Sequence, residues 1–116
     1  FLHLPSYPNV PNNVVMTGQT FGCEIPKAFY DYAQLTRVEM ARCGLTGPVL
    51  PEVGRLCCLE VFDVSKNRLT GRLPTEFQKL TTLEVLKVHG NQLSGQCKIR
   101  IYVKDKATPI MLILYF

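Results

Sequence analysis

The amino-acid sequence predicts a repeat solenoid in which every repeat adds one short strand to a parallel sheet. The first observation is a stretch from Leu56 to Gly71 whose apolar and Asn positions recur 24 residues later, between Leu80 and Gly95. The second is that stacking the chain at this offset, from Pro11 onward, fills five columns with apolar residues only. One repeat cannot bury its own apolar edge, so coils that stack in register are the arrangement that forms a continuous core.

Two of the five columns have the alternation of a strand, because their members are separated by a single residue. We therefore expect short parallel strands near residues 14–16, 38–40, 62–64, 86–88 and 110–112, about 4.8 Å apart. The first column is Val14, Val38, Phe62, Leu86 and Ile110, and the second is Met16, Met40, Val64, Val88 and Leu112. The other three lie on the return path of each coil: Phe21, Leu45, Leu69 and Leu93; Ile25, Val49, Leu73 and Cys97; Phe29, Val53, Phe77 and Ile101.

A polar position follows each expected strand, at the point where the chain turns out of the sheet. An Asn amide carries donors and an acceptor, so it can bridge the backbones of adjacent coils at such a turn. A thiol is small and is a weak donor, so Cys43 can occupy the same position. We interpret Cys43, Asn67 and Asn91 as one structural ladder, preceded by Gln19.

A third signature is Thr46-Gly47, Thr70-Gly71 and Ser94-Gly95. With the preceding positions it gives L-x-x-L-x-L-x-x-N-x-L-T/S-G-x-L/I-P, which resembles the plant-type subclass of leucine-rich repeats over residues 11–101. The resemblance implies an α/β-type, right-handed solenoid of about four to five repeats. It also implies a parallel sheet on the concave face, an irregular convex side with 3₁₀ turns, and a second short strand on the flank. Cys23 stands where later repeats have Gly, so we expect a less regular first flank.

The expected organisation is an irregular lead-in over residues 1–10, repeats over 11–101, and a degenerate terminal repeat or a cap over 102–116. Ile110 and Leu112 resume the inward columns, which favours a degenerate fifth repeat. The alternation over residues 98–104 instead fits a hairpin-like cap that turns at 105–109. Because neither end carries the polar cap that a solenoid needs, we expect the chain to belong to a longer protein or to be covered by partners.

Composition limits the classes of function. A length of 116 residues suits one domain, and 47% hydrophobic residues indicate a globular chain. The net charge of +4 comes without long basic runs, so we expect no nucleic-acid partner. No signal-peptide pattern is visible, and the C-terminal apolar run is too short for a membrane span, which takes about 20 residues. Membrane contact would therefore need sequence beyond that run. Five cysteines without zinc-type spacing and the lack of an Asn-x-Ser/Thr site leave extracellular and intracellular or organellar locations both open.

No catalytic or cofactor-binding motif is present, so we expect a chain that is not an enzyme and needs no cofactor or metal. The histidines are His3 and His89, and neither has partners spaced for catalysis or metal binding. The adjacent Cys57 and Cys58 could form a vicinal disulfide or a redox switch, but we interpret them as two ordinary thiols.

The outward positions of the expected strands form a grid of charged, small and aliphatic residues. Glu39 and Asp63 stack as like charges in it, Lys87 can relieve Asp63, and Arg42 and Lys66 form a small basic strip. In the family that this chain resembles, partners usually bind on this concave face. We therefore expect a partner-binding face made of Val15, Arg37, Glu39, Arg42, Val61, Asp63, Ser65, Lys66, Val85, Lys87 and His89.

The leading functional hypothesis is a receptor-like recognition module that binds a protein or peptide without catalysis. One alternative is a structural scaffold subunit embedded in a large multiprotein assembly. Another is an enzyme inhibitor of the leucine-rich-repeat type.

Overall fold

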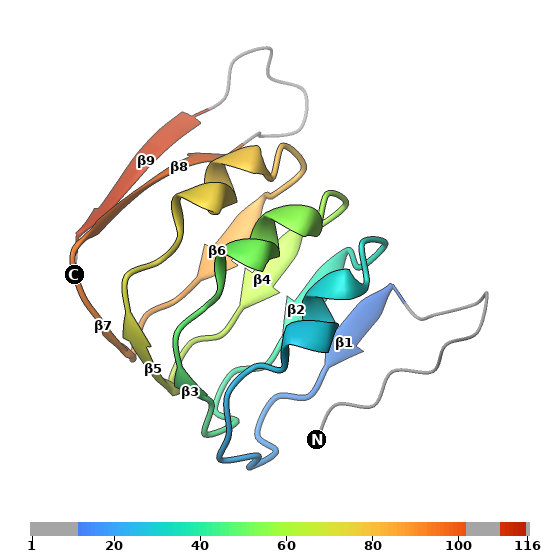
Figure 1. The fold of residues 1–116 in the computed structure, drawn as a ribbon, viewed down its shortest axis with the longest axis vertical. Helices are drawn as coiled ribbons and strands as arrows, with labels where there is room; N and C mark the ends of the chain where they lie inside the picture. The colour runs from blue at the N-terminus through green and yellow to red at the C-terminus, as the bar shows by residue number, and fades with distance from the viewer. Residues whose placement is uncertain (1–11, 102–109, 116) are drawn as a thin grey trace.

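A parallel sheet of four short strands forms one side of the molecule (Figure 1). The computed structural model describes residues 12–101 and 110–115. Within the sheet, Val14 pairs with Val38, Val38 with Phe62, and Phe62 with Leu86, so neighbouring strands are offset by the length of one repeat. The strands, in spatial order, are β1 (Asn13–Val15), β2 (Arg37–Glu39), β4 (Val61–Asp63) and β6 (Val85–Lys87).

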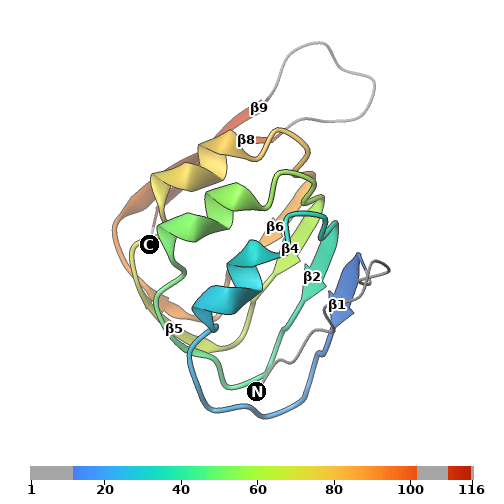
Figure 2. The same cartoon turned by 45° about the vertical axis from the view of Figure 1, so that its right-hand side comes forward.

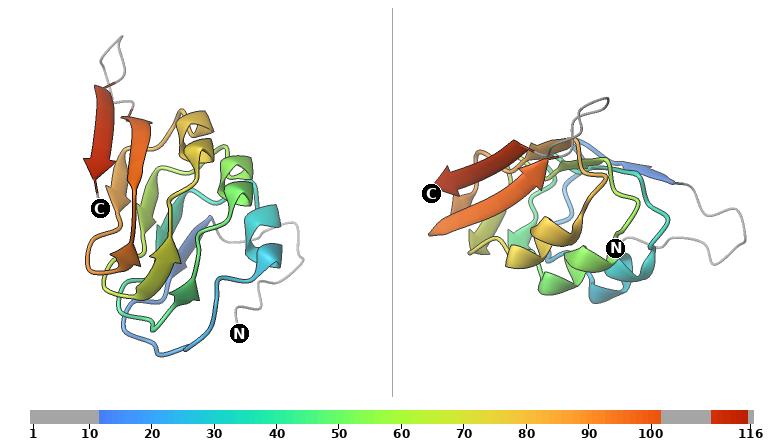
Figure 3. Two further views of the ribbon diagram at one scale, coloured as in Figure 1. Left: turned by 60° about the vertical axis from the view of Figure 1, so that its left-hand side comes forward. Right: turned by 90° about the horizontal axis from the view of Figure 1, so that it is seen from above.

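The opposite side of the coils carries three 3₁₀ helices that lie in a row across the sheet (Figure 2). Seen from above, the helices lie on one side and the four-stranded sheet on the other (Figure 3). The helices are η1 (Lys27–Asp31), η2 (Pro51–Arg55) and η3 (Thr75–Lys79). A second parallel sheet on the flank contains β3 (Thr46–Gly47), β5 (Arg68–Gly71) and β7 (Gln92–Leu93), in that order. The first coil contributes only an isolated bridge from Glu24 to Thr46, so its flank is the less regular one.

The apolar columns form a continuous core between the two sides. Val38, Phe62, Leu45, Leu69 and Phe77 are fully buried, with no accessible surface. Among the residues of the first and last coils, Met16, Phe21, Leu86 and Leu93 are partly buried and pack against this core. The prediction of a solenoid with short parallel strands and 3₁₀ turns on the other face is confirmed.

The C-terminal part differs from the favoured expectation of a degenerate fifth repeat. β8 (Gln96–Ile101) and β9 (Ile110–Tyr115) pair antiparallel, and Ile110 lies opposite Ile101 instead of continuing the column of Leu86. This is the hairpin alternative. Two apolar residues separated by one fit either a fifth parallel strand or a hairpin strand, so the register at Ile110 and Leu112 did not discriminate between them. The turn expected at 105–109, like the lead-in over 1–10, lies outside the described residues.

In the part of the chain that the structure describes, no helix has the length and apolar character that a membrane crossing requires.

Tyr30 gives the fold a specific sensitivity to alkaline pH. Its side chain is fully buried, and its hydroxyl accepts a hydrogen bond from the backbone N–H of Leu50 at 3.3 Å. Burial raises the pKa of Tyr30 to about 12, with a smaller contribution in the same direction from Glu52. In the unfolded chain the pKa returns to about 10, so between pH 10 and 12 the folded state holds a proton that the unfolded state has lost. Stability from this group is complete below pH 10 and is lost as the pH rises toward 12.

We expect the free energy of unfolding to fall by about 2 to 3 kcal/mol over this range because of Tyr30. Urea denaturation at a series of alkaline pH values measures the slope. In the matched variant Tyr30→Phe, the fall in the free energy of unfolding over this pH range should be smaller by that amount. The stability of the variant at neutral pH is lower, because the Leu50 N–H loses its acceptor. Equal slopes for the two proteins would contradict this assignment.

Candidate functional site

The face of the sheet that points away from the 3₁₀ helices carries most of the residues expected to bind a partner; we call it the concave face. The pairing register stacks Arg37, Val61 and Val85 in one row. It stacks Val15, Glu39, Asp63 and Lys87 in the next row. Val15 is 57% exposed and Val85 36%, the two large hydrophobic residues that the described chain leaves most open to solvent. The face therefore presents aliphatic contact area among charged groups.

The charges on the concave face are arranged differently from the sequence-based expectation. Glu39, expected to stack as a like charge on Asp63, instead pairs with the Arg37 guanidinium, which lies 2.7 Å from its carboxylate on the same strand face. Asp63 accepts hydrogen bonds from the backbone N–H of Ser65 at 3.0 Å and from its hydroxyl at 2.7 Å. Lys87 makes no ion pair with Asp63 among the described residues. Both carboxylates are thus held locally, whereas the exposed Lys87 is left available.

Ser65 is the predicted face residue that the structure places beneath the surface. Its side chain is only 4% exposed, because the chain begins to curl inward just after β4. Its hydroxyl orients Asp63 and does not point to solvent as a contact group. Strand alternation alone put Ser65 on the outward side, and it fails there because the strand ends at Asp63.

Arg42 and Lys66 hold a backbone conformation that is unfavourable for residues other than glycine. Their φ angles are +54° and +56°, and the corresponding positions in the neighbouring coils are Gly18 and Gly90, also with positive φ. A non-glycine residue in this region costs of order 1 to 3 kcal/mol. Both side chains are exposed at the rim of the concave face. Two cations thus stand where the backbone favours glycine.

The turn position beneath this rim is filled by a hydrogen-bonding ladder. The side-chain oxygen of Asn67 accepts from the backbone N–H groups of Cys43 at 2.8 Å and Leu45 at 3.1 Å, in the preceding coil. Its amide donates to Met40 O at 2.9 Å and Val64 O at 2.8 Å, so it joins two coils.

Asn91 repeats the pattern one coil later. It accepts from Leu69 N at 3.0 Å and donates to Val64 O at 3.0 Å. The Cys43 thiol donates to Met16 O at 3.0 Å, and burial raises its pKa, which makes it inert as a nucleophile.

The described part of the concave face gives little support for catalysis or metal binding. His89 is exposed there, and the side chains that the structure describes contain no group of three or more metal-ligating residues. A hollow of about 280 Å³ lies instead on the convex side between η2 and η3, lined by Pro51, Glu52, Gly54, Arg55 and Lys79. The concave face is exposed to solvent at Val15, Val85, Lys87 and His89.

Comparison with known proteins identifies the repeat. Residues 58–80 match the Leucine Rich Repeat family model. The chain is a leucine-rich-repeat protein. No curated protein sequence matches it significantly.

Several solved leucine-rich-repeat structures superpose on this chain. The ectodomain of the Arabidopsis thaliana receptor kinase GASSHO1/SCHENGEN3, in complex with CASPARIAN STRIP INTEGRITY FACTOR 2, is 26% identical with a TM-score of 0.70, over 72% of this chain and 10% of that one. The ectodomain of the Arabidopsis receptor kinase HAESA, in complex with an IDA peptide hormone ligand, is 32% identical with a TM-score of 0.62, over 65% and 13%. A plant ice-binding protein is 25% identical with a TM-score of 0.70, over 72% and 27%.

These matches define the resemblance and its extent. This leucine-rich-repeat protein resembles plant receptor ectodomains, a fold that is non-catalytic in the matched structures. It spans 10%, 43% and 12% of the first three matched structures. The likeness to an ice-binding protein indicates that the fold alone does not specify a ligand.

Proposed function

We propose that this protein is a non-catalytic, receptor-like recognition module that binds a protein or peptide on its concave face. The observation that carries the proposal is that Val15 and Val85 are exposed on a sheet face that also carries Lys87, a cation that makes no ion pair among the described residues. Apolar residues exposed among polar ones are typical of a contact surface. Two of the matched receptor ectodomains were solved with a peptide or protein factor bound, which supports the same use here.

The charges further indicate an acidic partner. Glu39 is neutralised by Arg37, and Asp63 is engaged by Ser65, whereas Arg42, Lys66 and Lys87 are exposed. A partner whose carboxylates meet these three cations would gain in association rate and in specificity. The glycine-type backbone at Arg42 and Lys66 supports this interpretation, because retaining a side chain there lowers stability.

The test is a selection of displayed random peptides on the wild-type protein at physiological salt, followed by calorimetry of the enriched peptides. We expect enrichment of Asp and Glu, and at least a tenfold loss of affinity in the double variant Lys66→Gly/Lys87→Glu, equivalent to about 1.4 kcal/mol. Lys66→Gly alone should raise the free energy of unfolding by roughly 0.5 to 1 kcal/mol while weakening binding.

The control is Lys79→Glu, which makes the same charge change as Lys87→Glu but lies in η3 on the convex side. It should leave binding unchanged. Peptides that bind the double variant as well as the wild type but lose affinity for Lys79→Glu would place the contact on the convex side and contradict the proposal.

A further inference from the structure

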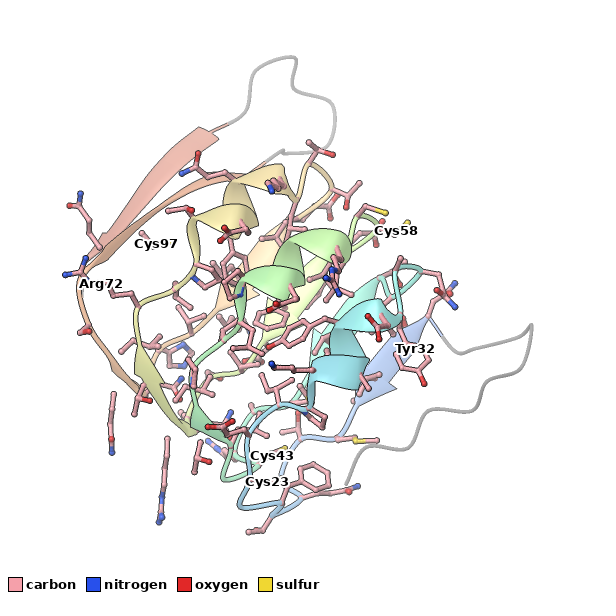
Figure 4. All side chains as sticks on the ribbon, in the orientation of Figure 1. Cys23, Tyr32, Cys43, Cys58, Arg72 and Cys97 are labelled. Atoms are coloured by element: carbon pink, nitrogen blue, oxygen red, sulfur yellow. The ribbon has the colours of Figure 1, made fainter. Side chains whose placement is uncertain are left out.

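Cys57 and Cys58 occupy the two central positions of a tight turn between η2 and β4. The backbone N–H of Leu59 donates to Leu56 O at 3.1 Å, which closes the turn, and both leucines are fully buried. The two cysteines between them are exposed and free. Figure 4 shows Cys58 at the outer rim, at the opposite end of the coils from Cys43. The backbone that carries the two thiols is therefore anchored while the sulfurs face solvent.

Contacts with both neighbouring coils hold the same turn. The Cys57 thiol lies 3.9 Å from Ala33 O in the preceding coil. The Thr82 hydroxyl of the following coil donates to Leu59 O at 2.8 Å and to Cys57 O at 3.3 Å. The corresponding turn positions in those coils hold Ala33-Gln34 and Thr81-Thr82, so the fold itself does not require cysteine at either place.

The geometry of adjacent residues disfavours a direct disulfide between the two sulfurs. The described residues contain no cis peptide bond, and Cα atoms joined by a trans peptide lie about 3.8 Å apart. A relaxed disulfide needs a Cα separation of about 4.4 to 6.8 Å. The side chain of Cys57 raises the pKa of the neighbouring Cys58 thiol, and both thiols are free and exposed on the same turn. An atom inserted between them would complete a larger and less strained ring.

We propose that Cys57 and Cys58 form a two-thiolate site for a soft, thiophilic ion on the rim of the solenoid. On binding, each thiol releases its proton to solvent and each sulfur forms one bond to the ion, with no change of oxidation state. Thiolates select soft ions over magnesium or calcium. Among the described side chains no third ligand converges on the pair, so the remaining coordination positions of the ion are filled by solvent or by the ion's own substituents.

Two probes test the site on the full chain. The first is Cd²⁺, a soft ion, titrated by calorimetry and by its thiolate-to-metal ultraviolet absorption. The second is phenylarsine oxide, which joins two thiols through trivalent arsenic with release of one water molecule and is detected as an adduct by intact-protein mass spectrometry. We expect one equivalent of each probe per chain, and an arsenical adduct that a dithiol removes but a monothiol does not.

The variants Cys57→Ser and Cys58→Ser should each weaken Cd²⁺ binding at least tenfold and abolish the dithiol-specific arsenical adduct. Both positions are exposed, so far-ultraviolet circular dichroism should match the wild type. Cys23→Ser, at a half-buried thiol in the first coil, is the control and should bind as the wild type does. Unchanged binding in either single variant, or conversion of the pair by glutathione disulfide into a stable intramolecular disulfide, would overturn the proposal.

Discussion

Replacing Phe62 with alanine is expected to lower the free energy of unfolding by about 3 to 5 kcal/mol. The side chain is fully buried, and its strand pairs in register with Val38 on one side and Leu86 on the other. Its ring also meets the ring of Phe77 edge-on, with centroids 5.6 Å apart and planes at 66°. The change would leave a cavity in the middle of the stack, between the coil that carries Val38 and the coil that carries Leu86.

Urea denaturation followed by circular dichroism measures this loss. The matched control is Val85→Ala, on the next strand of the sheet but on its exposed face. It should change stability by no more than about 0.5 kcal/mol. If the denaturation midpoint of Phe62→Ala equalled that of the control, the column of Val38, Phe62 and Leu86 would not be part of the stabilising core.

Replacing Asn67 with alanine is expected to lower the free energy of unfolding by about 2 to 6 kcal/mol. The change removes the acceptor for two backbone N–H groups, those of Cys43 and Leu45, which lie in the buried turn of the preceding coil. Each buried donor left without an acceptor costs about 1 to 3 kcal/mol. The same side chain also donates to Met40 O and Val64 O, so the variant loses its links on both coils.

Asn91→Ala provides a comparison at the same repeat position. Its oxygen accepts from one backbone N–H, that of Leu69, and the residue is half-buried. We expect it to cost about half as much as Asn67→Ala, measured by the same denaturation experiment. If Asn91→Ala lost as much stability as Asn67→Ala or more, the contribution of each amide to stability would not follow the number of buried donors that it satisfies.

The central coils were predictable because the constraint on each column is local in sequence and identical in every repeat. Val38, Phe62 and Met40 had to be apolar for one coil to cover the next, and the structure buries all three. The Thr-Gly signature likewise marked β3 and β5, because glycine there adopts positive φ at Gly47 and Gly71. With a fixed period, the same position of every repeat has to meet the same packing requirement, so one repeat predicts the next.

The C-terminal hairpin was not predictable from the same pattern. Ile110 and Leu112 satisfy the inward columns by alternation alone, and alternation is common to parallel and antiparallel strands. The backbone pairing of β8 with β9 decides between them. The two strands are not at equivalent positions of successive repeats, so the repeat pattern does not predict this pairing. Lys104 and Ala107, which stand where the repeat pattern has Leu, were the sequence signal against a fifth coil.

The face that carries the candidate site was predictable except at Ser65, but the arrangement of its charges was not. Register placed Val61, Asp63 and Lys87 on one face, as the pairing has them. Side-chain torsions decided the rest: Glu39 turns along its own strand to Arg37, and Asp63 turns back to Ser65. The positive φ angles of Arg42 and Lys66 follow from the repeat position shared with Gly18 and Gly90, and comparing that column could have indicated them.

The central claim is that side chains one repeat apart are in contact. A nuclear Overhauser experiment on the folded protein tests it most directly, through cross-peaks from the Phe62 ring. We predict cross-peaks to the methyl groups of both Val38 and Leu86, because adjacent strands of such a sheet lie about 4.8 Å apart and these residues pair in register. A well-dispersed spectrum in which Phe62 contacts neither residue would contradict the account.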